Sequence, residues 1–192
     1  DDIQLKLKFK IKKTYRKSFR RPNLIYAILE EENKSEKLLQ FLKAVPGSAI
    51  VYARNRAKTQ KIAELLTEND ISAGFYHAGL QNKVRDERQE AWINDKVRVI
   101  VATNAFGMGI DKPDVRLVIH LDLPDSLEAY FQEAGRGGRD EKTAYAIALW
   151  NKADIIDLEK YFQYSFPSIE SIKKLYESIC NHLQVAELSG AD

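Results

Sequence analysis

Two arginines stand three positions apart in a glycine-rich stretch, QEAGRGGRD, that runs from Gln132 to Asp140. A guanidinium has a permanent charge and five fixed donors, so Arg136 and Arg139 could each hold a phosphate through paired hydrogen bonds. The neighbouring glycines leave room for close backbone approach. An arginine that reaches a nucleotide on another lobe acts as an arginine finger and stabilises charge on the γ-phosphate during hydrolysis. The alternative is a basic turn that makes only surface salt bridges.

A second polar segment is a candidate phosphate-binding site. Arg54, Asn55 and Arg56 follow the apolar run 49–52 and precede an expected helix over 58–69. The free amides at a helix N-terminus can bind a phosphate. Arginines are also common in surface loops, so this segment carries little weight by itself.

Two further segments place polar residues after expected strands. His77 lies in the sequence YHAGL, residues 76–80, where it could contact a nucleic-acid phosphate or cap a turn; taken alone, the turn is favoured. In ATNAFGMGIDKP, residues 102–113, Thr103 offers a hydroxyl to a phosphate and Asp111 offers acceptors to a ribose hydroxyl. The glycines of this segment permit close approach of a ligand. The alternative is a tight loop between two strands.

The elements that carry these segments alternate along the chain. Apolar runs predict strands over 24–29, 49–52, 73–76, 97–102, 117–121 and 144–150, the last of which closes the sheet. Amphipathic stretches predict helices over 36–45, with Ser35 as its cap, and over 58–69, 83–94 and 126–134. This alternation indicates βαβ units and an α/β fold with helices on both faces of a mainly parallel sheet. Ligands bind beyond the carboxyl ends of such strands, so we expect all four polar segments there.

The two ends of the chain have different patterns. Leu5, Leu7, Phe9 and Ile11 alternate with lysines, which favours a strand with one lysine face. A solvated charged face and a nucleic-acid contact remain equal alternatives for this basic segment. After Trp150 only helices are expected, over 154–164 and 168–183, whose apolar positions form a core or a docking face. On the second of them, Cys180 is expected to be a small buried hydrophobic residue.

Composition indicates an ordinary globular protein: 192 residues, 44% hydrophobic and 30% charged, with a net charge of +2. A single cysteine excludes an internal disulfide and a cysteine-only zinc site, and it favours the reducing cytoplasm. No apolar run approaches the roughly 20 residues that a membrane helix needs, so we expect no membrane partner. The chain begins at Asp1 and its only methionine is Met108, so we expect it to be a piece of a longer protein.

The sequence lacks part of a nucleotide site. It contains no G-x-x-x-x-G-K-[ST] segment, the glycine-rich loop whose amides and lysine hold the phosphates of a nucleotide. It also has no acidic motif at a strand end to anchor magnesium. A chain with arginine fingers but no phosphate loop is half of a site, and by itself it should not hydrolyse ATP.

The ordered motifs at 76–80, 102–116 and 132–140 resemble the second motor lobe of RecQ-family DNA helicases. The sequence SFRRPN, residues 18–23, resembles the family's junction between its two motor lobes. The resemblance covers roughly residues 18 to 150. DEAD-box RNA helicases share this lobe, but they carry a histidine where Gln132 stands and lack the Phe-Gly-Met-Gly run.

This resemblance implies a 3′ to 5′ DNA-unwinding ATPase with two RecA-like lobes. ATP and Mg²⁺ would sit between the lobes, bound mainly by the first, and single-stranded DNA would cross both. Arg136 and Arg139 would be the motor arginines, and which of them is the finger stays open. Asp111, Gly109 and Gln132 would contact the nucleotide. The residues expected on the DNA side are Arg54, Asn55, Arg56, His77 and Thr103.

The resemblance also divides the chain and leaves alternatives. We predict a basic inter-lobe segment over 1–21, a RecA-like three-layer lobe over 22–150, and a helical start of the next domain over 151–192. Many relatives carry a four-cysteine zinc module there, whereas Cys180 stands alone, so we predict no zinc in this chain. The rival functions are a non-catalytic DNA-binding or regulatory lobe and an RNA-directed helicase. A second departure, Gly137 in place of alanine, should be tolerated.

Overall fold

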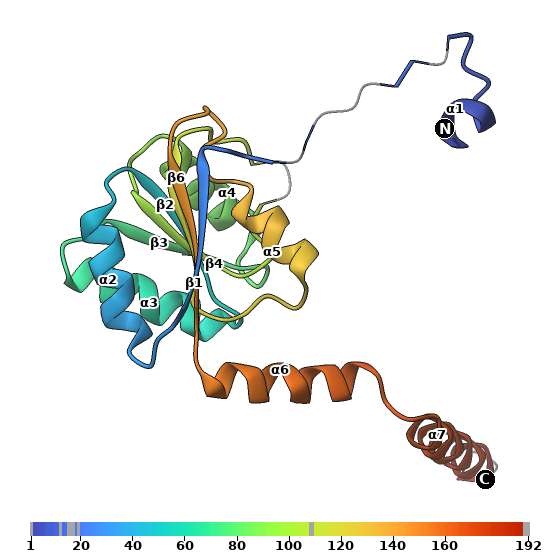
Figure 1. Cartoon of the computed structure of the whole chain (residues 1–192). Helices are drawn as coiled ribbons and strands as arrows, with labels where there is room; N and C mark the ends of the chain where they lie inside the picture. The colour runs from blue at the N-terminus through green and yellow to red at the C-terminus, as the bar shows by residue number, and fades with distance from the viewer. Residues whose placement is uncertain (1, 12, 15–17, 19, 108–109, 190–192) are drawn as a thin grey trace.

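A computed structural model describes residues 2–11, 13–14, 18, 20–107 and 110–189. Its centre is a six-stranded sheet in the order β1-β6-β5-β2-β4-β3, and every neighbouring pair is parallel (Figure 1). The strands are β1 Leu24–Glu30, β2 Ser48–Tyr52, β3 Ala73–Tyr76, β4 Val99–Ala102, β5 Val115–His120 and β6 Ala144–Trp150. The predicted parallel α/β sheet is confirmed.

Helices cover both faces of the sheet and make three layers. The helices α2 (Lys34–Ala44) and α3 (Arg56–Glu68) pack on one face, where their leucines and isoleucines meet the alternate residues of β2, β4 and β5. On the other face, α4 (Asn82–Ile93) brings Trp92 into a second core, and α5 (Leu127–Ala134) packs Tyr130 against β6. Figure 1 shows these two helix pairs on opposite sides of the strands.

Local sequence explains where these elements begin. Every residue of β2 and β4 is buried, as expected for uninterrupted apolar runs in the centre of a parallel sheet. Asparagine or serine caps three of the four helices that cover the sheet by accepting a hydrogen bond from a free backbone N–H. The cap of α2 is Asn33 and not Ser35, because the Asn33 side chain accepts from the Glu36 amide. The helix therefore starts two residues earlier than predicted.

The order of the strands differs from one expectation. The strand β6 lies between β1 and β5, so the first strand, and not the last, closes that edge of the sheet. All seven residues of β1 pair with β6, from Leu24 opposite Ala144 to Glu30 opposite Trp150. The edge strand is held by this pairing and leaves Tyr26 and Ile28 exposed.

The predicted N-terminal strand is wrong. Residues Asp2–Lys6 form a short helix, α1, and the amides of Leu7 and Phe9 bond to carbonyls four or five residues earlier. No described strand pairs with this segment, so its backbone groups bond locally despite the alternating pattern.

The C-terminal helices are confirmed as helices, α6 (Lys152–Ser165) and α7 (Ile169–Ser189). They extend away from the sheet (Figure 1), and their apolar side chains are exposed rather than buried in a core. Cys180 is only partly buried. A docking role for this face stays a prediction. Among the described helices, none has the length and apolar character needed to cross a bilayer.

Candidate functional site

Three of the four polar segments lie where the sequence predicts them, at the carboxyl ends of parallel strands. Arg54 follows β2, His77 follows β3 and Thr103 follows β4, and these three strands are neighbours in the sheet. Neighbouring parallel strands present their carboxyl ends side by side, which brings distant parts of the chain to one edge.

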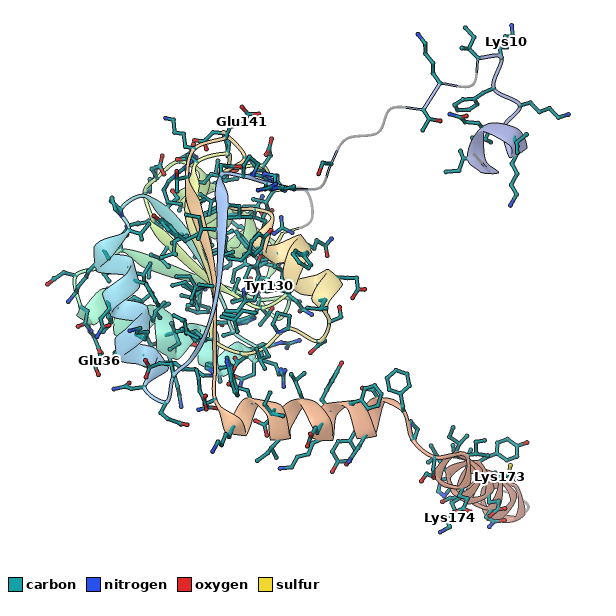
Figure 2. The ribbon with its side chains drawn as sticks, viewed as in Figure 1. Lys10, Glu36, Tyr130, Glu141, Lys173 and Lys174 are labelled. Atoms are coloured by element: carbon teal, nitrogen blue, oxygen red, sulfur yellow. The ribbon has the colours of Figure 1, made fainter. Side chains whose placement is uncertain are left out.

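The arginine loop, defined as residues 135–143, does not lie at that edge, so this expectation is wrong. Its Gly138 amide bonds to the carbonyl of Val115, the first residue of β5, at 2.8 Å. Helix α5 runs back along the sheet from the carboxyl end of β5, and the loop after it therefore reaches the amino ends of β5 and β6. Figure 2 shows Glu141, at the tip of this loop, at the end of the molecule opposite α6.

The segment 103–113 connects the two edges. Thr103 begins it at the carboxyl end of β4, and Asp111 lies close to the arginine loop near the start of β5. Phe106 fixes the middle of the segment by packing against two aromatic rings. The centroid of its ring lies 4.8 Å from that of Tyr76 and 5.4 Å from that of Trp92. Gly109, a predicted nucleotide contact, lies outside the described residues. One segment therefore contacts both candidate binding regions.

Arg136 is buried and bonds to the backbone of the segment 103–113. Its Nη1 donates to the Gly107 carbonyl at 2.7 Å, and Arg136 is only 9% exposed. Gly107 has a φ of +145°, and a Cβ there would lie 2.0 Å from the Arg136 guanidinium, so only glycine fits. Burial raises the pKa of the adjacent Tyr52, although the Arg136 charge opposes that rise. Arg136 is thus a structural cation in this state of the lobe.

Arg139 is accessible by comparison. Its Nη1 donates to Asp111 Oδ1 at 2.9 Å and to the Ile110 carbonyl at 3.2 Å. The side chains of Arg139 and Asp111 are 37% and 81% exposed. The fold therefore joins two residues that the sequence predicts at the nucleotide. Gln132, the third, is exposed on α5 and takes no part in this pair.

The residues predicted on the DNA side line a groove at the carboxyl edge. Arg54, Asn55, Arg56 and Thr103 all border it, together with the small side chain of Ala78. The Arg54 guanidinium donates to the Leu123 carbonyl at 2.8 Å. The side chain of Asn55 is engaged as the N-cap of α3, since it accepts from the Lys58 amide at 2.7 Å. Arg54 and Arg56 supply the groove's positive charge.

His77 lies beside this groove, half-buried against Phe75. The two rings stack with centroids 5.8 Å apart. Burial lowers the pKa of His77, and the charges of Arg56 and Arg88 lower it further. His77 is therefore neutral near pH 7 and can offer a hydrogen bond to a phosphate but no charge.

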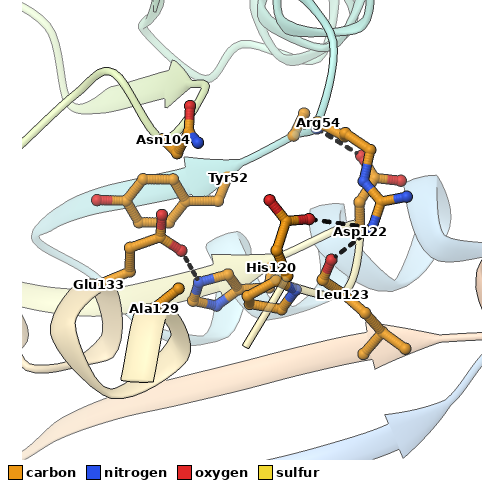
Figure 3. Close-up of a pocket in the computed structure, with 11 residues that line it drawn as sticks. Tyr52, Arg54, Asn104, His120, Asp122, Leu123, Ala129 and Glu133 are labelled. Atoms are coloured by element: carbon orange, nitrogen blue, oxygen red, sulfur yellow. Dashed lines mark hydrogen bonds and ion pairs between the residues drawn. The ribbon is translucent and has the colours of Figure 1, made fainter. Parts of the chain in front are cut away.

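A buried polar cluster at the end of β5 was not predicted from the sequence. His120 Nε2 lies 2.8 Å from Glu133 Oε2, and the His120 ring stacks on Tyr52 at 5.0 Å (Figure 3). A small pocket opens beside this cluster, bordered by Arg54 and Asp122. Glu133 is three residues before Arg136, so the cluster fixes the last turn of the helix that leads to the arginine loop. The spacing of 13 residues between His120 and Glu133 is no recognisable signal.

The arrangement can hold part of a nucleotide. Arg139 offers donors for phosphate oxygens, and Asp111 offers acceptors for a ribose hydroxyl, both at one exposed edge. Within the described residues, no three His, Cys, Asp or Glu side chains gather as they would around a metal ion.

The chain is similar to known helicase proteins. A family profile described as "Helicase conserved C-terminal domain" matches residues 33–141. The chain is similar to the ATP-dependent DNA helicase RecQ of Pasteurella multocida, with 44% identity over 160 residues, 83% of this chain and 25% of that protein. It is 40% identical over 157 residues to a protein of Acanthamoeba polyphaga mimivirus named as a candidate ATP-dependent RNA helicase, covering 81% of this chain and 29% of that protein.

A solved structure is also similar to this chain. The E. coli DEAD-box protein SrmB, bound to regulator of ribonuclease activity A, superposes with a TM-score of 0.63 and 29% sequence identity. The match covers 78% of this chain and 87% of that one. In contrast, the chain spans about a quarter of the length of the RecQ proteins it matches.

Proposed function

The chain belongs to the family of helicase conserved C-terminal domains, and from that premise we propose that it is the second motor lobe of a RecQ-like ATP-dependent DNA helicase. The resemblance to the RecQ family is confirmed by relatives at 40–44% identity. One observation carries the proposal: the segment 103–113 joins an arginine–aspartate pair at one edge to a basic groove at the other. A lobe that couples nucleotide state to DNA grip needs such a connection.

On the nucleotide side, we assign Arg139 to the phosphates and Asp111 to the ribose. An exposed ion pair contributes about 0–1 kcal/mol, so a nucleotide can replace Asp111 as the partner of Arg139 at little cost. Arg136 keeps its bond to Gly107 and holds the segment between the edges. The first lobe would supply the phosphate loop and bind Mg²⁺, and for this reason the chain by itself should not turn over ATP.

On the DNA side, Arg54 and Arg56 would contact backbone phosphates, and Thr103 and His77 would add uncharged hydrogen bonds. Contacts to phosphates carry no sequence information and weaken as salt rises. We therefore propose a grip on single-stranded DNA that depends on salt and little on sequence. We also propose a cytoplasmic location for the full protein, which the single cysteine favours.

Two other functions remain as alternatives. A regulatory lobe that binds DNA without turnover would have no use for the exposed Arg139–Asp111 pair, which argues against it. An RNA-directed helicase is disfavoured by Gln132 and by the Phe106 to Gly109 run. The mimivirus relative keeps this second alternative worth testing, and unwinding of matched DNA and RNA duplexes by the full-length protein separates the two substrates.

The test of the proposed function is ATP turnover by the full-length protein with and without single-stranded DNA. Arg139→Ala should lower kcat on the order of 10³-fold, the scale reported for an arginine finger. Nucleotide affinity should change far less. Absence of turnover in the unmutated protein, with DNA binding intact, would refute the helicase proposal and leave the regulatory lobe.

A further inference from the structure

Arg21, which precedes the first strand in the chain, donates hydrogen bonds to the backbone of the arginine loop. Its Nη2 donates to the carbonyl oxygens of Gly138 at 2.6 Å and Gly137 at 3.0 Å, and its Nη1 lies 3.4 Å from that of Gly135. These partners are 114 to 117 residues away in sequence. A single guanidinium thus bonds to three carbonyls of the loop that carries both motor arginines.

Asn23 also bonds to this loop, and we refer to Arg21 and Asn23 together as the clamp. Its Nδ2 donates to the Gly138 carbonyl at 2.7 Å and to the Lys142 carbonyl at 2.9 Å, so it joins the two ends of the turn. Gly138 has a φ of +58°, and a Cβ there would lie 2.7 Å from Asn23 Nδ2. The backbone of the loop is therefore shaped around Asn23, and that shape requires glycine.

Arg21 suits this position for two physical reasons. Its planar fork presents several donors at fixed angles, whereas a lysine ammonium cannot face three carbonyls in this geometry. Its positive charge also lies at the C-terminal end of α5, where the helix dipole favours a cation. Arg21 lies three residues ahead of Leu24, the first residue of β1.

We propose that Arg21 and Asn23 are positioning residues: they touch no nucleotide, and they hold the arginine loop so that Arg139 faces the nucleotide edge. This inference rests on the proposed function for its effect on turnover. Its structural part, the dependence of the loop on Arg21, stands independently. The clamp acts through the loop backbone, since Arg139 follows Gly138 directly in the chain.

A matched control exists within the same lobe. Arg98 also satisfies three carbonyls, those of Gly47 at 3.0 Å, Leu42 at 2.5 Å and Val45 at 2.7 Å. Its bonds go to the end of α2 and the turn after it, and none goes to the arginine loop. Arg98→Ala therefore removes the same kind of interaction and should cost similar stability without disturbing the loop.

The experiment compares Arg21→Ala, Arg21→Lys and Arg98→Ala in the full-length protein. A misplacement of about 1 Å remote from the reacting atoms can cost about 10²-fold, so Arg21→Ala should lower kcat by about that factor. The KM for ATP and the Kd for single-stranded DNA should stay near their original values. The kcat of Arg21→Lys should lie between those of Arg21→Ala and the unmutated protein. Arg98→Ala should keep the original kcat despite a lower Tm. Asn23→Ala replaces Arg21→Ala if the latter does not fold.

Hydrogen–deuterium exchange provides the second measurement, and it needs no activity. Amides of residues 135–143 should exchange faster in Arg21→Ala, whereas Arg98→Ala should change exchange around residues 42–47. Equal kcat in Arg21→Ala and Arg98→Ala, or unchanged exchange in the arginine loop, would overturn the proposal. If the unmutated protein shows no turnover, the proposed function fails, and the exchange result still decides whether Arg21 holds the loop.

Discussion

Replacing the two motor arginines by alanine, one at a time, should lower stability by different amounts. Arg136 is buried and donates to Gly107 at 2.7 Å, and a hydrogen bond from a charged group contributes roughly 1.5–3 kcal/mol. Arg139 pairs with Asp111 at the surface, where such a pair contributes about 0–1 kcal/mol. We therefore expect Arg136→Ala to lower the free energy of unfolding by about 2 kcal/mol, against less than about 1 kcal/mol for Arg139→Ala.

Equilibrium urea unfolding of this 192-residue chain measures the difference. For a chain of this size, about 2 kcal/mol also corresponds to a fall in Tm of roughly 4–8 °C, which a thermal melt detects. The matched control is Asp111→Ala, which removes the partner of Arg139 and should cost as little as Arg139→Ala. Equal losses for Arg136→Ala and Arg139→Ala would refute the distinction between a structural and a nucleotide-facing arginine.

Two further predictions concern buried groups. Glu133→Ala should destabilise the chain by roughly 1–3 kcal/mol because it leaves a buried ring nitrogen of His120 without its hydrogen-bond partner. Glu133→Gln, which keeps a hydrogen bond, should cost clearly less. Urea unfolding of both variants checks this, and equal losses would contradict it. His77 should titrate below the ordinary histidine value of about 6.5 because burial disfavours its charged form. The unfolded chain then takes up that proton first, so His77 lowers stability as the pH falls below about 6.5, and an NMR titration with a midpoint at or above that value would contradict the argument.

The sequence predicted most of the elements because their signals are local. The run Val99–Ala102 is apolar at every position, which is typical of a central parallel strand. Where a pattern depends on a partner, prediction failed. The alternating residues 5–11 have the period of a strand, yet none of the described strands lies beside them to accept their backbone bonds, and a short helix forms at Asp2–Lys6.

The sequence by itself identified the residues that we propose to carry the chemistry, since Arg136, Arg139 and Asp111 are recognisable from type and spacing. Only the tertiary structure decided their roles. It buries Arg136 under Gly107 and leaves Arg139 exposed on Asp111, although the two arginines are three positions apart in one loop. It also brings Arg21 to a loop more than 110 residues away. Burial and long-range hydrogen bonds depend on how helices pack on the sheet, and no local pattern of residues records that packing.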